Sequence, residues 1–241
     1  MKIETKILTK FLEEFSLSAE NQIGEALFKF ETEGLKVGSN DGQKQVFSTG
    51  WLKPEAFKEY SAIGNVGLND LANVIKVLGR FDEFVTITKQ GNLMTVAGSS
   101  KTSEKKVDVE LISENFLSTE AAEPKLTFTD TFVIGGKLLG EVVADAEMNK
   151  DAELIIATEP KKVMFSNTGK YRFNTTLVSP VTVGNARVSF GQPFVNAVAN
   201  LIKGDTKELE FSLANDYPAK IVKRTEHSVV TVIIAPRVKE E

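Results

Sequence analysis

Few residues in this sequence could carry out covalent or metal chemistry. The 241-residue chain has no cysteine and one histidine, His227. Thiolate chemistry, disulfides, and Cys-type or two-His metal sites are therefore excluded. A Ser–His–Asp triad would have to use His227, beside the strand-like run 228–234. Gly135-Gly136-Lys137 lacks the spaced first glycine and the Ser/Thr of a phosphate loop. We therefore expect a protein that is not an enzyme, with no catalytic residue, metal or cofactor.

The composition is that of a globular protein, with 41% hydrophobic and 26% charged residues. A net charge of −4 argues against a general nucleic-acid coat, but it allows a local basic patch on an acidic body. The apolar runs are far shorter than a membrane span, and the N-terminus has no signal-peptide core. We expect a cytosolic protein with no membrane partner.

The sequence repeats itself at half-length. A shift of 127 residues aligns the two halves without a gap as far as Phe84, and it places Asn73 on Asn200 and Lys76 on Lys203. A period this long exceeds that of solenoid repeats and indicates a duplicated domain. We assign 1–112 to an N-terminal domain, 113–125 to a connector and 126–241 to a C-terminal domain.

Hydrophobic periodicity predicts the same elements in both halves. Helices are expected over 6–15, 68–78, 132–146 and 193–203. Strands are expected over 25–31, 35–39, 44–49, 83–88, 93–97 and 105–112 in the first half, and over 152–157, 162–166, 170–178, 208–213, 219–224 and 229–234 in the second. Residues 53–60 are ambiguous. Each half is thus β-rich with two helices, an α+β layout.

One helix in each half carries a polar stripe. Asn69, Asn73, Lys76 and Arg80 are spaced as one helix face, and Asn196, Asn200 and Lys203 make the matching stripe. Amides and long cations can hold phosphates without reading bases. An ordinary surface helix is also polar on one side, so the pattern leaves both interpretations open.

Three stretches carry a resemblance to a known family. They are 34–41 (GLKVGSND), 68–82 (LNDLANVIKVLGRFD) followed by a Val-Thr-Ile strand, and Tyr217-Pro-Ala-Lys-Ile with Val232-Ile-Ile-Ala-Pro-Arg-Val238 near the C-terminus. The chain resembles the sliding clamps that are similar to proliferating cell nuclear antigen, over nearly its whole length. The third stretch is the most specific, because order and spacing both agree.

The resemblance implies a homotrimeric ring of two-domain subunits that acts as a DNA polymerase processivity factor in DNA replication. Sheets would lie outside, and all helices would line a hole that encircles duplex DNA. The implied partners are duplex DNA bound without sequence preference, a DNA polymerase, a clamp loader and replication proteins with peptide motifs. The implied location is the cytoplasm or nucleoid, or the replication site in the host if the protein is viral. A ring needs only weak phosphate contacts, which suits the acidic composition.

The resemblance also implies site residues. Matching to the inner helices of the family gives a DNA-facing set, and the acids Glu13, Glu14 and Glu141 depart from the family pattern. The DNA-facing set comprises Lys6, Lys10, Asn73, Lys76, Arg80, Lys137, Asn200 and Lys203. Ring closure would use the strands 105–112 and 170–178. The alternative is that both are ordinary edge strands protected by Lys and Glu.

A partner groove is implied beneath the connector. Its residues, matched by position, are Asn40, Lys44, Phe47, Phe116, Leu117, Pro218, Ile233, Ala235 and Pro236. The chain has Ile233-Ile234 where the family often has an aromatic residue, and Lys44 where histidine is common. Plain core packing would equally account for Phe47.

Two other functions are compatible with the sequence. One is a β-rich structural or assembly protein, such as a virion component, with a duplicated domain and no DNA tethering. The other is an enzyme on an α+β scaffold, for which no nucleophile–base pair is visible.

Overall fold

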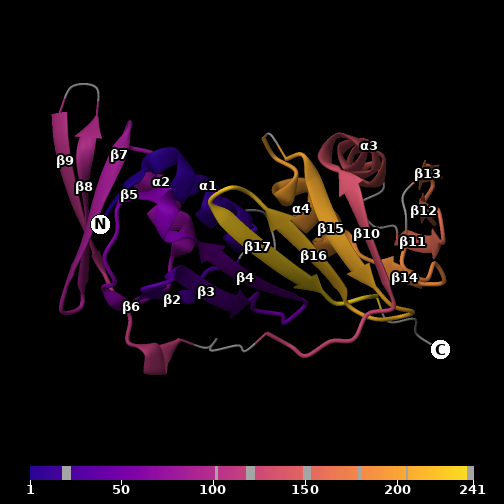
Figure 1. Ribbon diagram of the computed structural model, residues 1–241, viewed down its shortest axis with the longest axis horizontal. Coiled ribbons are helices and arrows are strands. Elements are labelled where there is room, and N and C mark those ends of the chain that lie inside the picture. The colour runs from indigo at the N-terminus through magenta and orange to yellow at the C-terminus, as the bar shows by residue number, and fades with distance from the viewer. Residues whose placement is uncertain are drawn as a thin grey trace. The chain divides into compact units, whose positions relative to one another are not determined.

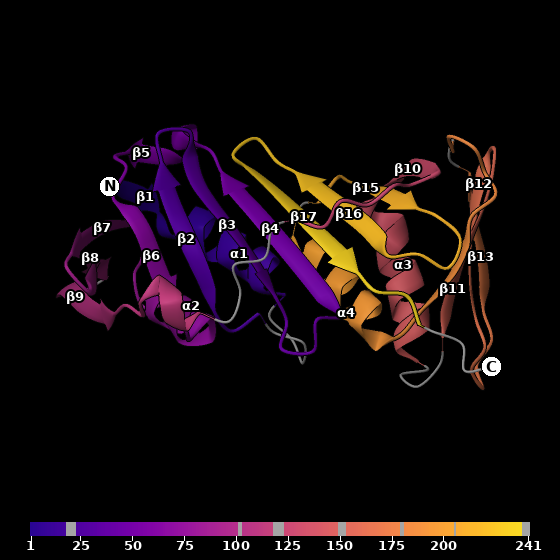
Figure 2. The ribbon, with the colours of Figure 1, turned by 90° about the horizontal axis from the view of Figure 1, so that it is seen from below.

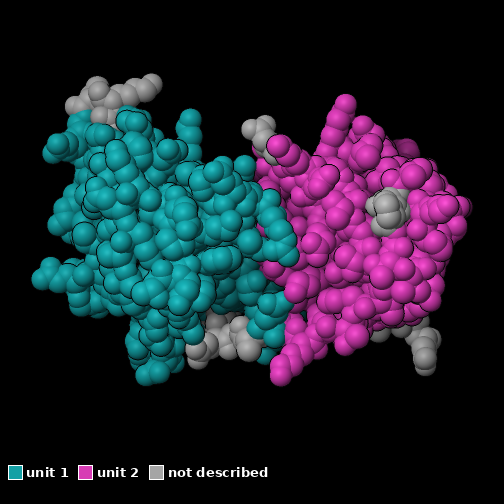
Figure 3. Space-filling view, viewed as in Figure 1, with its two compact units in different colours: residues 1–18, 22–123, 224–230 teal, residues 19–21, 124–223, 231–241 magenta. Residues whose placement is uncertain are grey.

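The computed structural model describes residues 1–17, 23–100, 103–117, 123–148, 153–178, 181–204 and 206–237. The chain divides into two compact units (Figure 3). The N-terminal unit comprises 1–18, 22–123 and 224–230, and the C-terminal unit comprises 19–21, 124–223 and 231–241. Each unit is described by itself below.

The N-terminal unit has two helices and two runs of paired strands (Figure 1). The helices are α1 (Thr5–Ser16) and α2 (Leu71–Leu78). One run has the order β4-β3-β2-β6, with β4 Val46–Leu52, β3 Gly34–Asn40, β2 Ala26–Glu31 and β6 Gly64–Leu68. The other has the order β5-β1-β7-β8-β9, with β5 Phe57–Glu59, β1 Lys2–Glu4, β7 Phe84–Gln90, β8 Leu93–Ser100 and β9 Ser103–Glu110. Short 3-10 turns span Pro54–Ala56 and Glu114–Phe116.

The core of the N-terminal unit lies where its helices meet its sheets. Figure 2 shows β6, β2, β3 and β4 side by side, with α1 behind them. On α1, apolar residues at helical spacing bury one face, as Leu8 and Leu12 illustrate. They line one apolar region together with Phe28 of β2, Val74 of α2 and Ile87 of β7. Burying these faces leaves the polar sides of α1 and α2 outward.

The C-terminal unit repeats this plan. Its helices are α3 (Gly136–Glu147) and α4 (Gln192–Leu201). One run of strands has the order β10-β15-β16-β17, with β10 Asp130–Gly135, β15 Glu208–Leu213, β16 Ala219–Arg224 and β17 Ser228–Ile234. Of these strands, residue 224 and residues 228–230 are counted with the N-terminal unit. The other has the order β13-β12-β11-β14, with β13 Asn174–Val178, β12 Lys162–Asn167, β11 Leu154–Glu159 and β14 Arg187–Phe190. The predicted α+β class, with two helices in each half, is confirmed.

β5 lies in the run 53–60, which the sequence left ambiguous, and four further strands were absent from the sequence prediction: β1, β6, β10 and β14. Each comes shortly before a helix, so the helices predicted over 68–78 and 132–146 begin too early. A short apolar run reads alike in a strand and in a helix. Pairing with a neighbour decides the outcome: β10 pairs with β15, and the rings of Phe132 and Phe211 stack 5.3 Å apart.

A buried carboxylate organises one loop of the C-terminal unit. Asp130 is fully buried and accepts hydrogen bonds from the backbone N–H groups of Gly184, Asn185 and Ala186, at 2.8–3.1 Å, and from the Thr158 hydroxyl. Burial alone would raise the pKa of Asp130, but these hydrogen bonds outweigh it and lower the pKa below its ordinary value.

Candidate nucleic-acid interface

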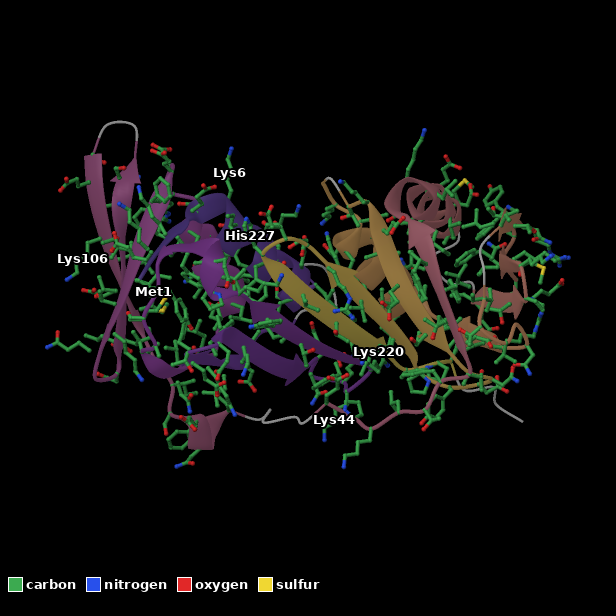
Figure 4. All side chains as sticks on the ribbon, viewed as in Figure 1. Met1, Lys6, Lys44, Lys106, Lys220 and His227 are labelled. Carbon is green, nitrogen blue, oxygen red and sulfur yellow. The ribbon has the colours of Figure 1, made fainter. Side chains whose placement is uncertain are left out.

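Helix α1 presents a mixed charged face. Because Leu8, Phe11, Leu12 and Phe15 are buried, the exposed positions are those of Lys6, Lys10 and Glu13, which share one side of the helix. Figure 4 shows the Lys6 side chain extending away from the ribbon. Glu14, by contrast, is only 4% exposed. Of the acids that depart from the family pattern on this helix, only Glu13 therefore accompanies the two lysines at the surface.

Helix α2 is shorter than the predicted stripe. Asp70 is its N-cap and accepts a 3.0 Å hydrogen bond from the Asn73 backbone N–H, and the helix ends at Gly79. Asn69 and Arg80 therefore flank the helix instead of belonging to it. Asn73, Lys76 and Arg80 are nevertheless all exposed.

The lysines of the N-terminal helix pair are free to meet a ligand. Within the described ranges, no hydrogen bond or ion pair involves Nζ of Lys6, Lys10 or Lys76. A free ammonium group on a flexible stem can hold a phosphate oxygen as a point charge. With Arg80, this pair of helices offers four exposed cations.

The C-terminal helix pair offers fewer cations. On α3, Lys137 shares its exposed face with Glu141, four residues on, and with the 59%-exposed Met148 just past the helix end. On α4 no residue is fully exposed, and Lys203 lies in the turn after the helix. Lys137 and Lys203 are therefore the two cations of the predicted set in this unit.

The expectation that Asn200 faces a ligand needs correction. Asn200 is only 4% exposed. Its Nδ2 donates to the Asn196 carbonyl at 2.9 Å, and its Oδ1 accepts from Lys203 Nζ at 2.7 Å. Because the side chain is buried, it cannot contact a bound phosphate directly. Gln192, which no pattern in the sequence singles out, continues this set of contacts, because its amide donates to Asn196.

Two strands lie at the ends of their sheets, as ring closure would need. β9 ends the five-stranded run of the N-terminal unit, and β13 ends the four-stranded run of the C-terminal unit. β13 begins at Asn174, later than the predicted 170–178, and its last residue, Val178, is 91% exposed. An edge strand has unpaired backbone groups that can pair with another chain.

The groove residues of the N-terminal unit differ in accessibility. Asn40 is half-buried and pairs with Phe47 across β3 and β4. Phe47 is 6% exposed and packs in the core, so it can line a groove only from beneath. Lys44 is exposed, with a φ of 56° in the turn after β3, and extends from the ribbon in Figure 4. In the connector Phe116 is 76% exposed, whereas Leu117 is half-buried.

The remaining groove residues belong to the C-terminal unit. Ile233 is 5% exposed and lies in its core, Pro218 and Pro236 are half-buried, and Ala235 is exposed. After β17 the chain runs to Arg237, whose backbone N–H donates to the Ser189 carbonyl at 2.8 Å. The Arg237 guanidinium lies 3.9 Å from Glu153. These contacts hold the Ala235–Pro236 segment against β14.

Other kinds of site receive no support from the described residues. No group of three or more His, Asp or Glu side chains in the described ranges could hold a metal ion. Among the helices of the described segments, none has the length and apolar character that a membrane crossing requires.

The sequence of the chain is similar to those of known proteins. No protein-family model matches it. The DNA polymerase sliding clamp of Thermococcus sibiricus is 27% identical over 239 residues, covering 92% of this chain and 93% of that protein. The DNA polymerase sliding clamp of Nanoarchaeum equitans is 22% identical, covering 89% and 91%.

Solved structures agree over the whole chain. PCNA from A. fulgidus, solved with the C-terminal region of FEN-1 bound, superposes with a TM-score of 0.86 at 17% identity and covers 100% of this chain and 98% of that one. PCNA from Entamoeba histolytica gives a TM-score of 0.83 at 16% identity, covering 98% of each chain. The chain therefore has the fold of proliferating cell nuclear antigen, and its sequence is similar to that of DNA polymerase sliding clamps along nearly the full length of both.

Proposed function

We propose that this protein is a DNA sliding clamp, a processivity factor that closes into a homotrimeric ring around duplex DNA. The observation that carries the proposal is the sequence match to DNA polymerase sliding clamps over 92% of the chain, together with the shared fold of PCNA. The protein then acts by tethering partners to DNA and not by catalysis. Its place of action is where DNA is replicated, in the cytoplasm or nucleoid.

The helix pairs supply the contacts to DNA. Lys6, Lys10, Lys76, Arg80, Lys137 and Lys203 are exposed, and Asn73 is their polar neighbour. Long cations on helices suit phosphates of any sequence. A few weak contacts suffice, because encirclement and not affinity retains the ring. This accounts for an overall charge of −4 in a protein that works on DNA.

Ring closure is assigned to β9 of one copy and β13 of the next. Both are sheet edges, and their pairing would continue one sheet into the other. Light scattering with size exclusion tests this assignment, since three chains of 26.4 kDa should elute as one particle.

The change Val178→Asp should shift that particle to monomers, because it places an unpaired carboxylate in the contact. Val183→Asp is the matched control, since Val183 is 49% exposed in a loop outside β13. Equal masses for both variants would refute the β13 assignment.

Partners are proposed to dock through short peptides at the connector and the C-terminal segment. The exposed ring of Phe116 offers an apolar contact, and Leu117 and Pro236 offer half-buried surface. A DNA polymerase, a clamp loader and other replication proteins are the expected partners. Phe116→Ala should weaken capture of a polymerase C-terminal peptide without changing the trimer.

Topological retention is the decisive test of function. The protein is loaded by its cognate clamp loader onto a nicked circular plasmid, and part of the sample is then cut once by a restriction enzyme. A ring stays on the circle during gel filtration in high salt and slides off the linear form. A stable monomer with equal loss from both forms would contradict the proposal and favour a structural protein.

A further inference from the structure

The polar side chains of α4 form a continuous hydrogen-bonded ladder. Gln192 Nε2 donates to Asn196 Oδ1 at 2.9 Å, and Asn200 Nδ2 donates to the Asn196 carbonyl at 2.9 Å. Asn200 Oδ1 then accepts from Lys203 Nζ at 2.7 Å. These residues lie on one side of the helix, at spacings of four, four and three. The ladder ends on a cation of the proposed DNA-facing set.

The chemistry of each partner fixes the direction of the ladder. An ammonium group can only donate and a backbone carbonyl can only accept. The Asn200 amide must therefore turn its oxygen to Lys203 and its nitrogen to Asn196. Asn200 is 4% exposed, so water does not compete freely for these bonds. If the amide were turned over, its N–H groups would face the Lys203 ammonium group, and its oxygen would face the Asn196 carbonyl.

The backbone beneath Lys203 is held by a second set of contacts. The carbonyl of Leu201, the last residue of α4, accepts from Thr206 Oγ1 at 2.9 Å and from Lys223 Nζ at 2.6 Å. Lys223 is only 2% exposed, so a buried cation sits at the negative end of the helix. The turn that carries Lys203 is thereby anchored to β16.

We infer that Asn200 is a positioning residue that holds the Lys203 ammonium group in place for a DNA phosphate. The inference rests on the proposed clamp function. A lysine has three donors, so the bond to Asn200 leaves two for phosphate oxygens. Ordering the flexible stem in advance removes an entropic cost that binding would otherwise carry.

The equivalent helix of the N-terminal unit lacks this device. The positions 127 residues earlier are Asn65, Asn69, Asn73 and Lys76. Asn65 donates instead to Glu114 at 2.7 Å, and Asn69 precedes the helix. Asn73 is exposed, and its side chain makes none of the contacts seen for Asn200 within the described ranges. The ladder is therefore particular to α4 and does not follow from the repeat.

A readout without DNA tests the tether itself. Nitrogen-15 NMR on lysine side chains measures how fast each ammonium group exchanges with water. Lys203 should exchange slowly in the full-length protein and in Asn200→Asp, which keeps the acceptor, and quickly in Asn200→Leu, which has similar size but no acceptor. Asn73→Leu is the matched control and should leave the Lys76 signal unchanged. A Lys203 signal that is the same in Asn200→Leu as in the unaltered protein would overturn the inference.

Binding of a short duplex tests the consequence. Asn200→Leu should weaken affinity by about two- to tenfold at low salt, and it should cause no further loss in a Lys203→Met background. Loss of equal size in that background would mean that Asn200 acts otherwise than through Lys203, and would overturn the inference. If the unaltered protein fails both to bind duplex and to stay on a circle while Lys203 still exchanges slowly, the proposed function fails and the tether has no phosphate to serve.

Discussion

In the N-terminal unit the ammonium group of Lys76 on α2 has no hydrogen-bond or ion-pair partner among the described residues, whereas in the C-terminal unit Lys203 donates to a buried asparagine. The two lysines are equivalent in the sequence repeat. The N-terminal helix pair offers four exposed cations, and the C-terminal pair offers two. Lys76, in the unit with more exposed cations, has no hydrogen bond to the described residues. In the unit with fewer, the Lys203 ammonium group is already held by a hydrogen bond. Duplication preserved the residue types, while packing divided their roles.

The two units also differ in the buried residue of their first strand. In the repeat, Asp130 takes the position of Ile3, and both residues are fully buried. Ile3 contributes apolar area in β1, whereas Asp130 satisfies the N–H groups of a loop. At this equivalent position, the N-terminal unit therefore buries an apolar side chain, whereas the C-terminal unit buries a carboxylate.

The largest expected effect comes from breaking that second contrast. Asp130→Ala leaves three backbone N–H groups without their acceptor and should lower the free energy of unfolding by about 3–5 kcal/mol. Ile3→Val, the counterpart in β1, should cost only about 0.5–1.5 kcal/mol. Urea denaturation followed by fluorescence measures both. Equal losses would mean that the hydrogen bonds of Asp130 contribute nothing beyond packing.

The same carboxylate predicts a dependence on pH. The pKa of Asp130 is lowered on folding, so its contribution to stability is present above its unfolded pKa, about 3.9. That contribution is lost as the pH falls through the lower folded value. The difference in stability between the unaltered protein and Asp130→Asn should therefore shrink in acid. Thermal unfolding at a series of pH values tests this, and a constant difference would contradict it.

The exposed cations of the two helix pairs predict how DNA binding depends on salt. Lys76→Met with Arg80→Met should reduce the slope of log affinity against log salt by about 1.8 if both side chains contact phosphate. Lys137→Met with Lys203→Met should reduce the slope of log affinity against log salt by a similar amount, because it also removes two cations. It leaves all four cations of the N-terminal helix pair in place, whereas the first double variant leaves two. Fluorescence anisotropy with a short duplex measures both slopes. Unchanged slopes in both double variants would remove these helices from the interface.

The smallest expected effect concerns the starts of α2 and α4. Asp70 caps α2, whereas Gly191 precedes α4 without a side-chain cap. Asp70→Ala should cost about 1 kcal/mol, and Gly191→Asp should change stability by only a few tenths of a kcal/mol. Denaturant unfolding distinguishes the two, with Asn69→Ala as the control beside the cap. A larger change in stability for Gly191→Asp than for Asp70→Ala would contradict the prediction.

The sequence allowed accurate prediction of several elements with a clear hydrophobic period. The strands 208–213 and 219–224 were predicted with the bounds that the structure gives, and α1 with bounds that differ by one residue at each end. The strands before the helices were missed, because each apolar run leads into the helix that follows it, and pairing with a neighbouring strand decides where the strand ends.

For the candidate site, too, some features could be predicted from the sequence and others could not. Exposure of Lys6, Lys10 and Lys76 follows from the apolar spacing of their helices and could be predicted. The burial of Asn200 could not be predicted, because its counterpart Asn73, the same residue type at the equivalent position of the repeat, lies at the surface.

By itself the sequence determined the duplication, the α+β class, the exclusion of thiol chemistry and the types of residue that each helix carries, because these depend on composition and local period. The tertiary structure alone decided which strands form the sheet edges, which amide is buried and which lysine it holds. Such contacts join residues through packing across elements, and no spacing along the chain records them.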